Sequence, residues 1–115
     1  MGQRWMMSSK IHKAVSTQAE PGYIGSITID EDLLDKVGLL VHERVLVVSI
    51  TSGARLETYT LAAPRGSRTI CINGAAARLI GVGEELIIMG FQLSDGPNEP
   101  KAILVDSENN FVQYL

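Results

Sequence analysis

Apolar and polar residues alternate along most of the chain, and a period of two is typical of strands with one buried face. No segment has a long helical period. The alternation, with turn residues between the runs, predicts roughly seven short strands and suggests a small β-barrel, whose closure would leave few exposed strand edges. The strands are expected among residues 10–15, 23–29, 45–50, 55–62, 69–72, 85–93, 102–105 and 111–115.

One segment has the features of a short helix instead. Asp30 is a suitable N-cap, acidic residues follow it in the first turn, and Gly38 is a suitable end. Leu33, Leu34 and Val37 would form its apolar side. A second helical turn is predicted over residues 75–79, after an Asn-Gly dipeptide that favours a tight turn.

The composition narrows the class of protein. The chain has 115 residues, of which 45% are hydrophobic and 20% charged, so we expect one soluble globular domain. The net charge of −3, the scattered basic residues and the 5% of aromatic residues argue against a nucleic-acid partner. Cys71 is the only cysteine and there are two histidines, which argues against a disulfide or a metal site. No secretory signal or membrane-spanning run is visible, so a cytoplasmic location is expected.

Five short motifs carry more information than the composition. In their order and spacing they resemble the aspartate 1-decarboxylase family, pyruvoyl-dependent enzymes that make β-alanine for pantothenate and coenzyme A. Each motif alone is common, but the joint occurrence of the five in register is specific, and the resemblance runs without gaps from about Arg4 to about Phe91. The motifs are Lys10-Ile11-His12, Tyr23-Ile24-Gly25-Ser26, Arg55-Leu56-Glu57-Thr58-Tyr59, Arg65-Gly66-Ser67-Arg68 and Asn73-Gly74-Ala75-Ala76-Ala77.

The resemblance implies a mainly β fold, a six-stranded double-psi β-barrel with one or two short helices. It also implies an inactive proenzyme, a single domain over residues 1–115, that cleaves itself into residues 1–25 and 26–115. The hydroxyl of Ser26 would attack the carbonyl of Gly25, and elimination and hydrolysis would leave a covalent pyruvoyl group in place of Ser26. Neither pyridoxal phosphate nor a metal would then be needed.

The residue types at the cleavage site suit this chemistry. Gly25 lacks a Cβ and so permits a strained backbone with an open carbonyl. Ser26 is a nucleophile already within reach of that carbonyl. The resemblance implies that Thr58 assists the cleavage and also contacts the substrate. It also implies that Tyr59 donates a proton to the substrate carbon after CO2 has left, a general-acid role.

The same resemblance assigns the binding of L-aspartate. Arg55 would pair with a substrate carboxylate, to which a guanidinium fork is suited. Lys10 and His12 would line the same pocket. The remaining matching positions form a turn whose backbone contacts the substrate: Asn73, Gly74, Ala75 and Ala76.

The spacing along one strand raises a question about the assembly. Arg55 and Tyr59 would lie about 13 Å apart along a straight strand, too far to contact one aspartate unless the strand bends or another subunit contributes. The resemblance implies a homotetramer with active sites between subunits. Whether a further partner protein assists the cleavage stays open.

Other interpretations remain for these residues. Taken alone, Ser26 is an ordinary strand serine, Tyr59 a surface tyrosine and Arg55 a solvated charge. A barrel that never cleaves and has a regulatory role is one alternative, and a small DNA-binding dimer is another. The sequence also departs from the family pattern at Val48, where some members have an aromatic residue, and in a weakly matching segment from Leu93 onward.

Overall fold

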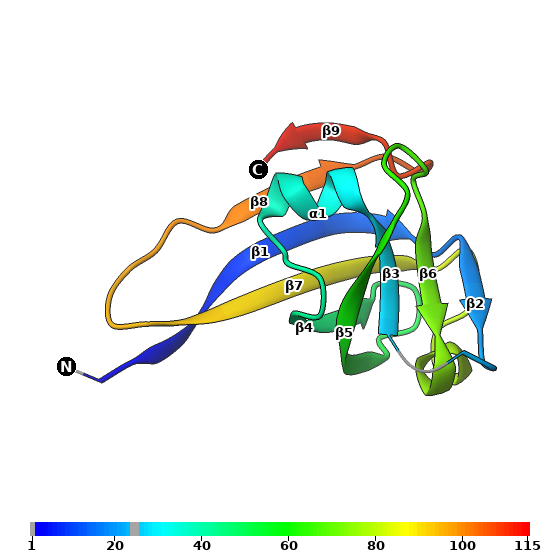
Figure 1. The fold of residues 1–115 in the computed structure, drawn as a ribbon, viewed down its shortest axis with the longest axis horizontal. Helices are drawn as coiled ribbons and strands as arrows, with labels where there is room; N and C mark the ends of the chain where they lie inside the picture. Colours follow the sequence, from blue (N-terminus) through cyan, green and yellow to red (C-terminus); the bar gives the residue numbers. More distant parts are fainter. Residues whose placement is uncertain (1, 24–25) are drawn as a thin grey trace.

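The computed structural model describes residues 2–23 and 26–115, which form nine strands, one α-helix and one 3-10 helix (Figure 1). The mainly β character and the short helices confirm the predicted class. The helices are α1 (Glu31–Val37) and η1 (Gly74–Arg78). The strands are β1 (Arg4–Val15), β2 (Gln18–Glu20), β3 (Ser26–Asp30), β4 (Arg44–Ser49), β5 (Arg55–Ala63), β6 (Ile70–Asn73), β7 (Glu85–Ser94), β8 (Lys101–Val105) and β9 (Phe111–Tyr114).

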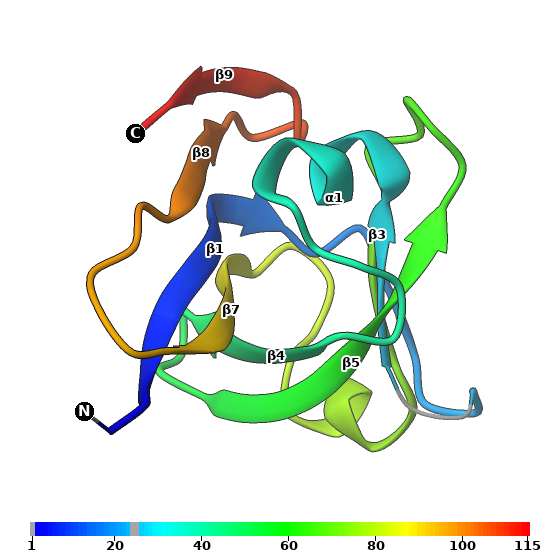
Figure 2. The same cartoon turned by 60° about the vertical axis from the view of Figure 1, so that its left-hand side comes forward.

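The strands follow one another in the order β2-β6-β3-β5-β4-β7-β1-β8-β9. Between β2 at one end and β8 and β9 at the other lie six strands, the number expected for the barrel. Only Ser16 and Thr17 separate β1 from β2, so that one continuous segment pairs with β7 and with β6. The backbone N–H of Thr17 donates to Ile70 O at 2.8 Å. The end strand β1 therefore continues into β2, which pairs with β6 at the other end of the six-strand row. The strands curve into the ring seen in Figure 2.

Strand β5 joins two parts of this ring. Its first half, Arg55–Tyr59, pairs antiparallel with β4 in a ladder without a register shift. Its second half, Thr60–Ala63, pairs parallel with β3. Residues at the middle of β5 therefore lie where the two halves of the barrel meet.

The predicted helix is confirmed, with the predicted cap residues. The Asp30 carboxylate accepts a hydrogen bond from the backbone N–H of Asp32 at 2.9 Å, and Gly38 ends the helix with a φ of +73°. Asp30 also accepts from the N–H groups of Gly66 at 3.1 Å and Arg68 at 2.8 Å. One buried carboxylate thus fixes both the start of α1 and the loop that leads into β6.

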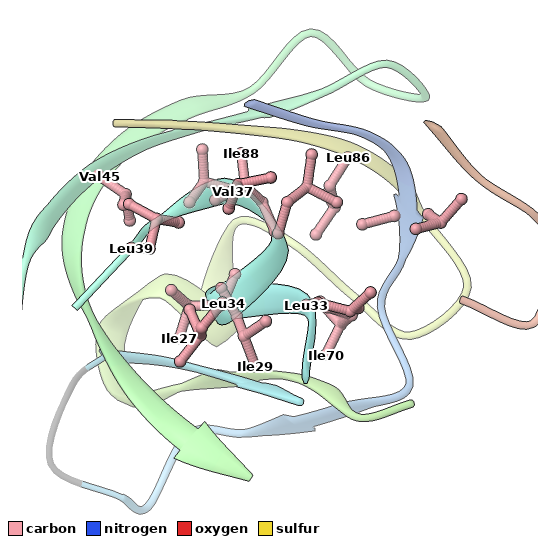
Figure 3. Close-up of a cluster of buried hydrophobic side chains, with 14 of the residues drawn as sticks. Ile27, Ile29, Leu33, Leu34, Val37, Leu39, Val45, Ile70, Leu86 and Ile88 are labelled. Atoms are coloured by element: carbon pink, nitrogen blue, oxygen red, sulfur yellow. The ribbon is translucent and has the colours of Figure 1, made fainter. Parts of the chain in front are cut away.

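The core lies between α1 and the inner face of the barrel (Figure 3). Every second residue of the strands points inward, as the alternation predicted, and a fully buried Ile or Leu contributes roughly 1.5–3 kcal/mol. The helix adds its three predicted apolar residues. The largest fully buried side chains include Ile11, Ile27, Ile29, Leu34, Ile70, Ile72, Ile80, Leu86, Ile88 and Ile103.

One sequence prediction was wrong in detail. Strand β1 begins at Arg4 and not at residue 10, because its first residues pair with the end of β7 although their side chains, such as Trp5, are largely exposed. The helical turn predicted over residues 75–79 is confirmed as the 3-10 helix η1, which begins one residue earlier at Gly74, with a φ of +64°. Among the residues that the structure describes, no helix is long and apolar enough to cross a membrane.

Candidate active site

Ser26 is the first residue of β3 and lies directly opposite Asn73, the last residue of β6. Its side chain is completely buried, and the Asn73 Nδ2 donates a hydrogen bond to Ser26 Oγ at 3.4 Å. The φ of Ser26 is +129°, a region that residues with a side chain rarely adopt. Such backbone strain costs on the order of 1–3 kcal/mol and persists only where the surrounding structure enforces it.

Two further side chains contact the carboxamide of Asn73. Its Nδ2 donates to Thr28 Oγ1 at 2.9 Å, and its Oδ1 accepts from the thiol of Cys71 at 3.1 Å. Thr28 and Cys71 are also opposite each other in the β3–β6 register. These four residues, Ser26, Thr28, Cys71 and Asn73, are called the Ser26 cluster below. All four lie on the face of β3 and β6 that points away from the core, because Ile27 and Ile72 between them point into it.

The helix η1 extends the Ser26 cluster along the backbone. Asn73 occupies its N-cap, but the Asn73 side chain makes no capping hydrogen bond and is turned toward β3 instead. Gly74 is buried, Ala76 half-buried and Ala75 exposed. The predicted Asn-Gly-Ala-Ala turn therefore directly adjoins the predicted nucleophile.

Tyr59 and Thr58 are consecutive residues of β5, the strand that pairs with β3, but their side chains point to opposite faces of it. Because Ile27 pairs with Thr60 in the parallel β3–β5 ladder, Tyr59 is next to Ser26 in the register. The Tyr59 side chain is 37% exposed, whereas Thr58 is half-buried and faces the other side of the strand. The structure thus places Ser26, Asn73 and Tyr59 on the three adjacent strands β3, β6 and β5.

Lys10, His12 and Arg55 form a second group. His12 pairs with Ile87, Ile87 with Val48 and Val48 with Arg55, so these four side chains cross four adjacent strands on one face. Lys10 is on the same face of β1, and Ile11 between Lys10 and His12 points into the core. We call this surface, made of Lys10, His12, Val48, Arg55 and Ile87, the cationic face. Arg55 is exposed, and Lys10 and His12 are half-buried.

His12 has an unusual environment within the cationic face. Burial, and after it the charges of Lys10 and Lys13, lower the pKa of His12 below its ordinary value, against a smaller opposing effect of Glu85. The His12 Nδ1 is buried and has no hydrogen-bond partner among the described residues. His12 is therefore a neutral imidazole at neutral pH with one ring nitrogen left open.

The structure does not bring Arg55 and Tyr59 together within one chain. Both residues belong to the regular β4–β5 ladder, which has no bulge between them, so the expected separation of about 13 Å holds. The Ser26 cluster and the cationic face are thus two separate surfaces, the first on β3 and β6 and the second on β1, β4, β5 and β7.

Two surface cavities lie near these groups. The larger, about 440 Å³, contains none of the predicted site residues and is lined by Trp5, Glu43, Arg44, Val45, Leu46, Glu57 and Phe91. The smaller, about 400 Å³, is lined by Thr28, Cys71 and Asn73 of the Ser26 cluster together with residues such as Gln18 and Tyr23. We associate the chemistry with the smaller cavity because it adjoins Ser26 through these side chains. No group of three or more potential metal ligands occurs in residues 2–23 and 26–115.

One predicted site residue, Gly25, lies outside the described residues. Thr28 and Cys71, in contrast, were not predicted as site residues. In the sequence, Cys71 served only as an argument against a disulfide or a metal site. The period of two contained the missing signal, because Thr28 and Cys71 stand two residues from Ser26 and Asn73 and so share their face.

Comparisons with known proteins show the family to which this chain belongs. The family model described as aspartate decarboxylase matches residues 2–112, which extends past residue 91, where the resemblance noted in the sequence ends. Aspartate 1-decarboxylase of Desulfitobacterium hafniense is 51% identical over 96% of this chain and 90% of its own length. The enzyme of Bacillus velezensis with the same name is 47% identical over 97% of this chain and 91% of its own length. The crystal structure of the rationally designed protein mkDPBB_sym_86 has a TM-score of 0.50 at 18% identity and covers 77% of this chain and 97% of its own. This likeness supports the double-psi β-barrel fold alone.

Proposed function

The chain belongs to the aspartate decarboxylase family of enzymes, and we propose that it converts L-aspartate to β-alanine and CO2 with a pyruvoyl group made from its own Ser26. One observation carries the proposal. Ser26 is completely buried, has a φ of +129° and receives a hydrogen bond from Asn73. An ordinary strand serine needs none of these features.

The features of Ser26 suit a self-cleavage between Gly25 and Ser26. Strain in the backbone beside the scissile bond raises the energy of the uncleaved chain, so the reaction can relieve it. A donor already placed on the serine oxygen stabilises negative charge there without reorganisation. Burial excludes water, which protects the ester that forms first from hydrolysis.

The proposed cleavage consumes no protein group other than the Ser26 side chain and the bond between Gly25 and Ser26. Ser26 Oγ bonds to the Gly25 carbonyl carbon, the amide C–N bond breaks, and the released amine takes up the hydroxyl proton. Loss of the Ser26 α-proton and of the Gly25 carboxylate then leaves dehydroalanine at position 26. One water is consumed and one ammonia released as this residue becomes the pyruvoyl group. The products are residues 1–25 and 26–115, and a processing partner is not required by these steps.

The pyruvoyl group supplies an electrophilic carbonyl that holds the substrate amine and accepts the electrons left when CO2 departs. The chain's own residues bind the substrate and donate a proton to it. Tyr59, next to residue 26 and partly exposed, holds the proton for the substrate carbon. Gly74, Ala75 and Ala76, which follow Asn73 in η1, bind the substrate with their backbone groups, and the hydroxyl of Thr58 assists the cleavage and contacts the substrate. A substrate carboxylate pairs with Arg55, in a pocket that Lys10 and His12 complete.

We place each active site between two copies of the chain. Arg55 cannot reach a substrate held at Ser26 of its own chain, because the β4–β5 ladder keeps it about 13 Å from Tyr59. A homotetramer in which the cationic face of one copy covers the Ser26 cluster of the next copy meets this requirement. The enzyme would act in the cytoplasm and feed pantothenate and coenzyme A synthesis.

The intact mass of the denatured protein tests the proposal. We expect two chains, residues 1–25 and 26–115, the second lighter than a serine-started chain by the mass of one ammonia. Ser26→Ala is the matched control and should stay at the full-length mass without converting aspartate to β-alanine. A wild-type protein that stays full-length while it decarboxylates aspartate would overturn the pyruvoyl assignment. A cleaved product from Ser26→Ala would remove Ser26 from the mechanism.

A further inference from the structure

The orientation of the Asn73 carboxamide depends on two side chains that have no role in the proposed mechanism. We propose that Cys71 and Thr28 are positioning residues, which hold Asn73 with its Nδ2 on Ser26 Oγ and so set the rate of self-cleavage. This inference rests on the proposed function, because it concerns the serine that would form the pyruvoyl group. It goes beyond that function in assigning a task to the only cysteine of the chain.

A carboxamide must be held at both ends to keep one orientation. The Asn73 Oδ1 accepts from the Cys71 thiol at 3.1 Å, and the Nδ2 has two hydrogens for its two acceptors, Thr28 Oγ1 at 2.9 Å and Ser26 Oγ at 3.4 Å. The contact with Ser26 is the longest of the three. It therefore depends on the two shorter contacts that aim the amide group.

A rotation of the carboxamide by half a turn would reverse this pattern. The Nδ2 would then face the Cys71 sulfur, a weak acceptor, and the donor on Ser26 would be lost. Asn73 is only 6% exposed, so water offers little replacement for a lost partner. Cys71 and Thr28 together disfavour this alternative.

The protonation state of Cys71 is consistent with the donor role. Burial, and to a smaller extent the charge of Glu20, raise the pKa of the Cys71 thiol above its ordinary value. The thiol therefore keeps its proton at neutral pH and can donate it to Asn73 Oδ1. A thiolate would instead repel the carboxamide oxygen.

The consequence for the proposed reaction follows from the direction of the hydrogen bond. Because Asn73 donates to Ser26 Oγ, the serine proton is free to leave in another direction. The Nδ2 then stabilises the negative charge that develops on the oxygen as it attacks. A carboxamide that is free to rotate would offer this donor for only part of the time.

Paired substitutions separate this role from simple packing. Thr28→Val and Cys71→Ala each remove a contact with Asn73, whereas Thr28→Ser and Cys71→Ser keep a hydroxyl at that place. Ile72→Val is the matched control, since Ile72 lies between Cys71 and Asn73 but points into the core. The measurement is the time course of cleavage after cell-free synthesis, followed by intact mass, with the thermal midpoint of each full-length chain measured in a Ser26→Ala background.

Loss of one such contact is expected to slow cleavage roughly fivefold to tenfold in Thr28→Val and Cys71→Ala. Thr28→Ser and Cys71→Ser should cleave within about twofold of the wild type, because a hydroxyl can replace each contact. Ile72→Val should lower the thermal midpoint while its cleavage stays at the wild-type rate. Equal cleavage rates in all five variants, or rates that follow only the thermal midpoint, would overturn the positioning role.

A second readout keeps this inference separate from the proposed function. In the uncleaved Ser26→Ala protein, NMR spectra should show the Asn73 side-chain amide protons protected from exchange. The protection should fall when Thr28→Val or Cys71→Ala is added and persist with Ile72→Val. If the wild type never cleaves, the proposed function fails, yet this protection still tests how Asn73 is held. If the wild type cleaves and neither rate nor protection changes, only the positioning role fails.

Discussion

The Ser26 cluster and the cationic face are built in opposite ways. In the cluster, Ser26 and Asn73 are almost completely buried and linked by hydrogen bonds between adjacent strands. On the cationic face, Arg55 is exposed, and the buried Nδ1 of His12 has no partner among the described residues. The buried polar groups of the cluster are paired with one another, whereas the cationic face has an exposed guanidinium and a buried ring nitrogen without a partner among the described residues.

This difference corresponds to two kinds of chemistry. The proposed self-cleavage occurs within one chain, so its groups can be oriented and shielded from water when the chain folds. Substrate binding needs an open surface with charge that a carboxylate can reach. Ser26 and its neighbours are thus organised by the fold of one chain, whereas the proposed role of the cationic face requires contact with another copy.

A substitution of Tyr59 should change the turnover of aspartate most, because Tyr59 lies next to Ser26 in the register but is partly exposed. Tyr59→Phe removes the hydroxyl proton and keeps the ring. If Tyr59 acts as the general acid, the turnover of aspartate should fall roughly 10²- to 10⁴-fold while cleavage proceeds normally. Intact mass and β-alanine formation measure the two steps separately.

Either of two results would break this assignment for Tyr59. Full turnover in Tyr59→Phe would remove it from the mechanism, and a block in cleavage would make it part of the Ser26 cluster. Tyr114→Phe is a suitable control, because Tyr114 belongs to β9, at the far end of the sheet order.

Arg55 tests whether the two surfaces meet between copies. Arg55→Ala should cleave normally, but kcat/KM should fall roughly 10- to 100-fold, since a hydrogen-bonded charge pair with the substrate is lost. Arg44→Ala is the control, because Arg44 is also exposed and pairs with Glu57 on the neighbouring strand.

Coexpression of Arg55→Ala with Ser26→Ala chains sharpens this test. Each variant alone is defective, but a mixed tetramer contains sites with an intact Ser26 cluster from one copy and an intact cationic face from the other. Random mixing in equal amounts should restore roughly a quarter of the wild-type activity. If each active site lay within one chain, mixing would restore nothing.

The sequence predicted some of these features better than others. The helix α1 was predicted with its cap Asp30 and its end Gly38, because capping is a local property of a few residues. The strands were found through the period of two, but the start of β1 was missed, since its first residues pair without burying their side chains. Pairing between distant segments leaves little trace in the local pattern.

The site itself was predicted through the resemblance and not through the pattern. Nothing local to Ser26 indicates its positive φ or its contact with Asn73, which is 47 residues away in the sequence. Thr28 was missed for the same reason, because its hydrogen bond with Asn73 depends on the register of β3 and β6, whereas Cys71 contacts Asn73 two residues along the same strand. The separation of Arg55 from Tyr59, however, followed from strand geometry alone and holds in the regular β4–β5 ladder.

His12 gives the smallest expected effect, on the pH dependence of stability. Its pKa is lowered in the folded protein, mainly by burial, while the unfolded chain keeps the ordinary value near 6.5. Between these two values the unfolded state binds more protons, so the free energy of unfolding should fall as the pH is lowered through this range. His12→Gln should make this decrease in the free energy of unfolding smaller, which is measured as the thermal midpoint between neutral and mildly acidic pH.

A second variant tests the charge next to His12. Lys13→Gln should raise the pKa of His12 in an NMR titration, because Lys13 contributes to lowering it. If Lys13→Gln leaves that pKa unchanged, Lys13 does not act on the imidazole. If the thermal midpoint decreases with pH as steeply in His12→Gln as in the wild type, the imidazole of His12 does not contribute to the pH dependence of stability.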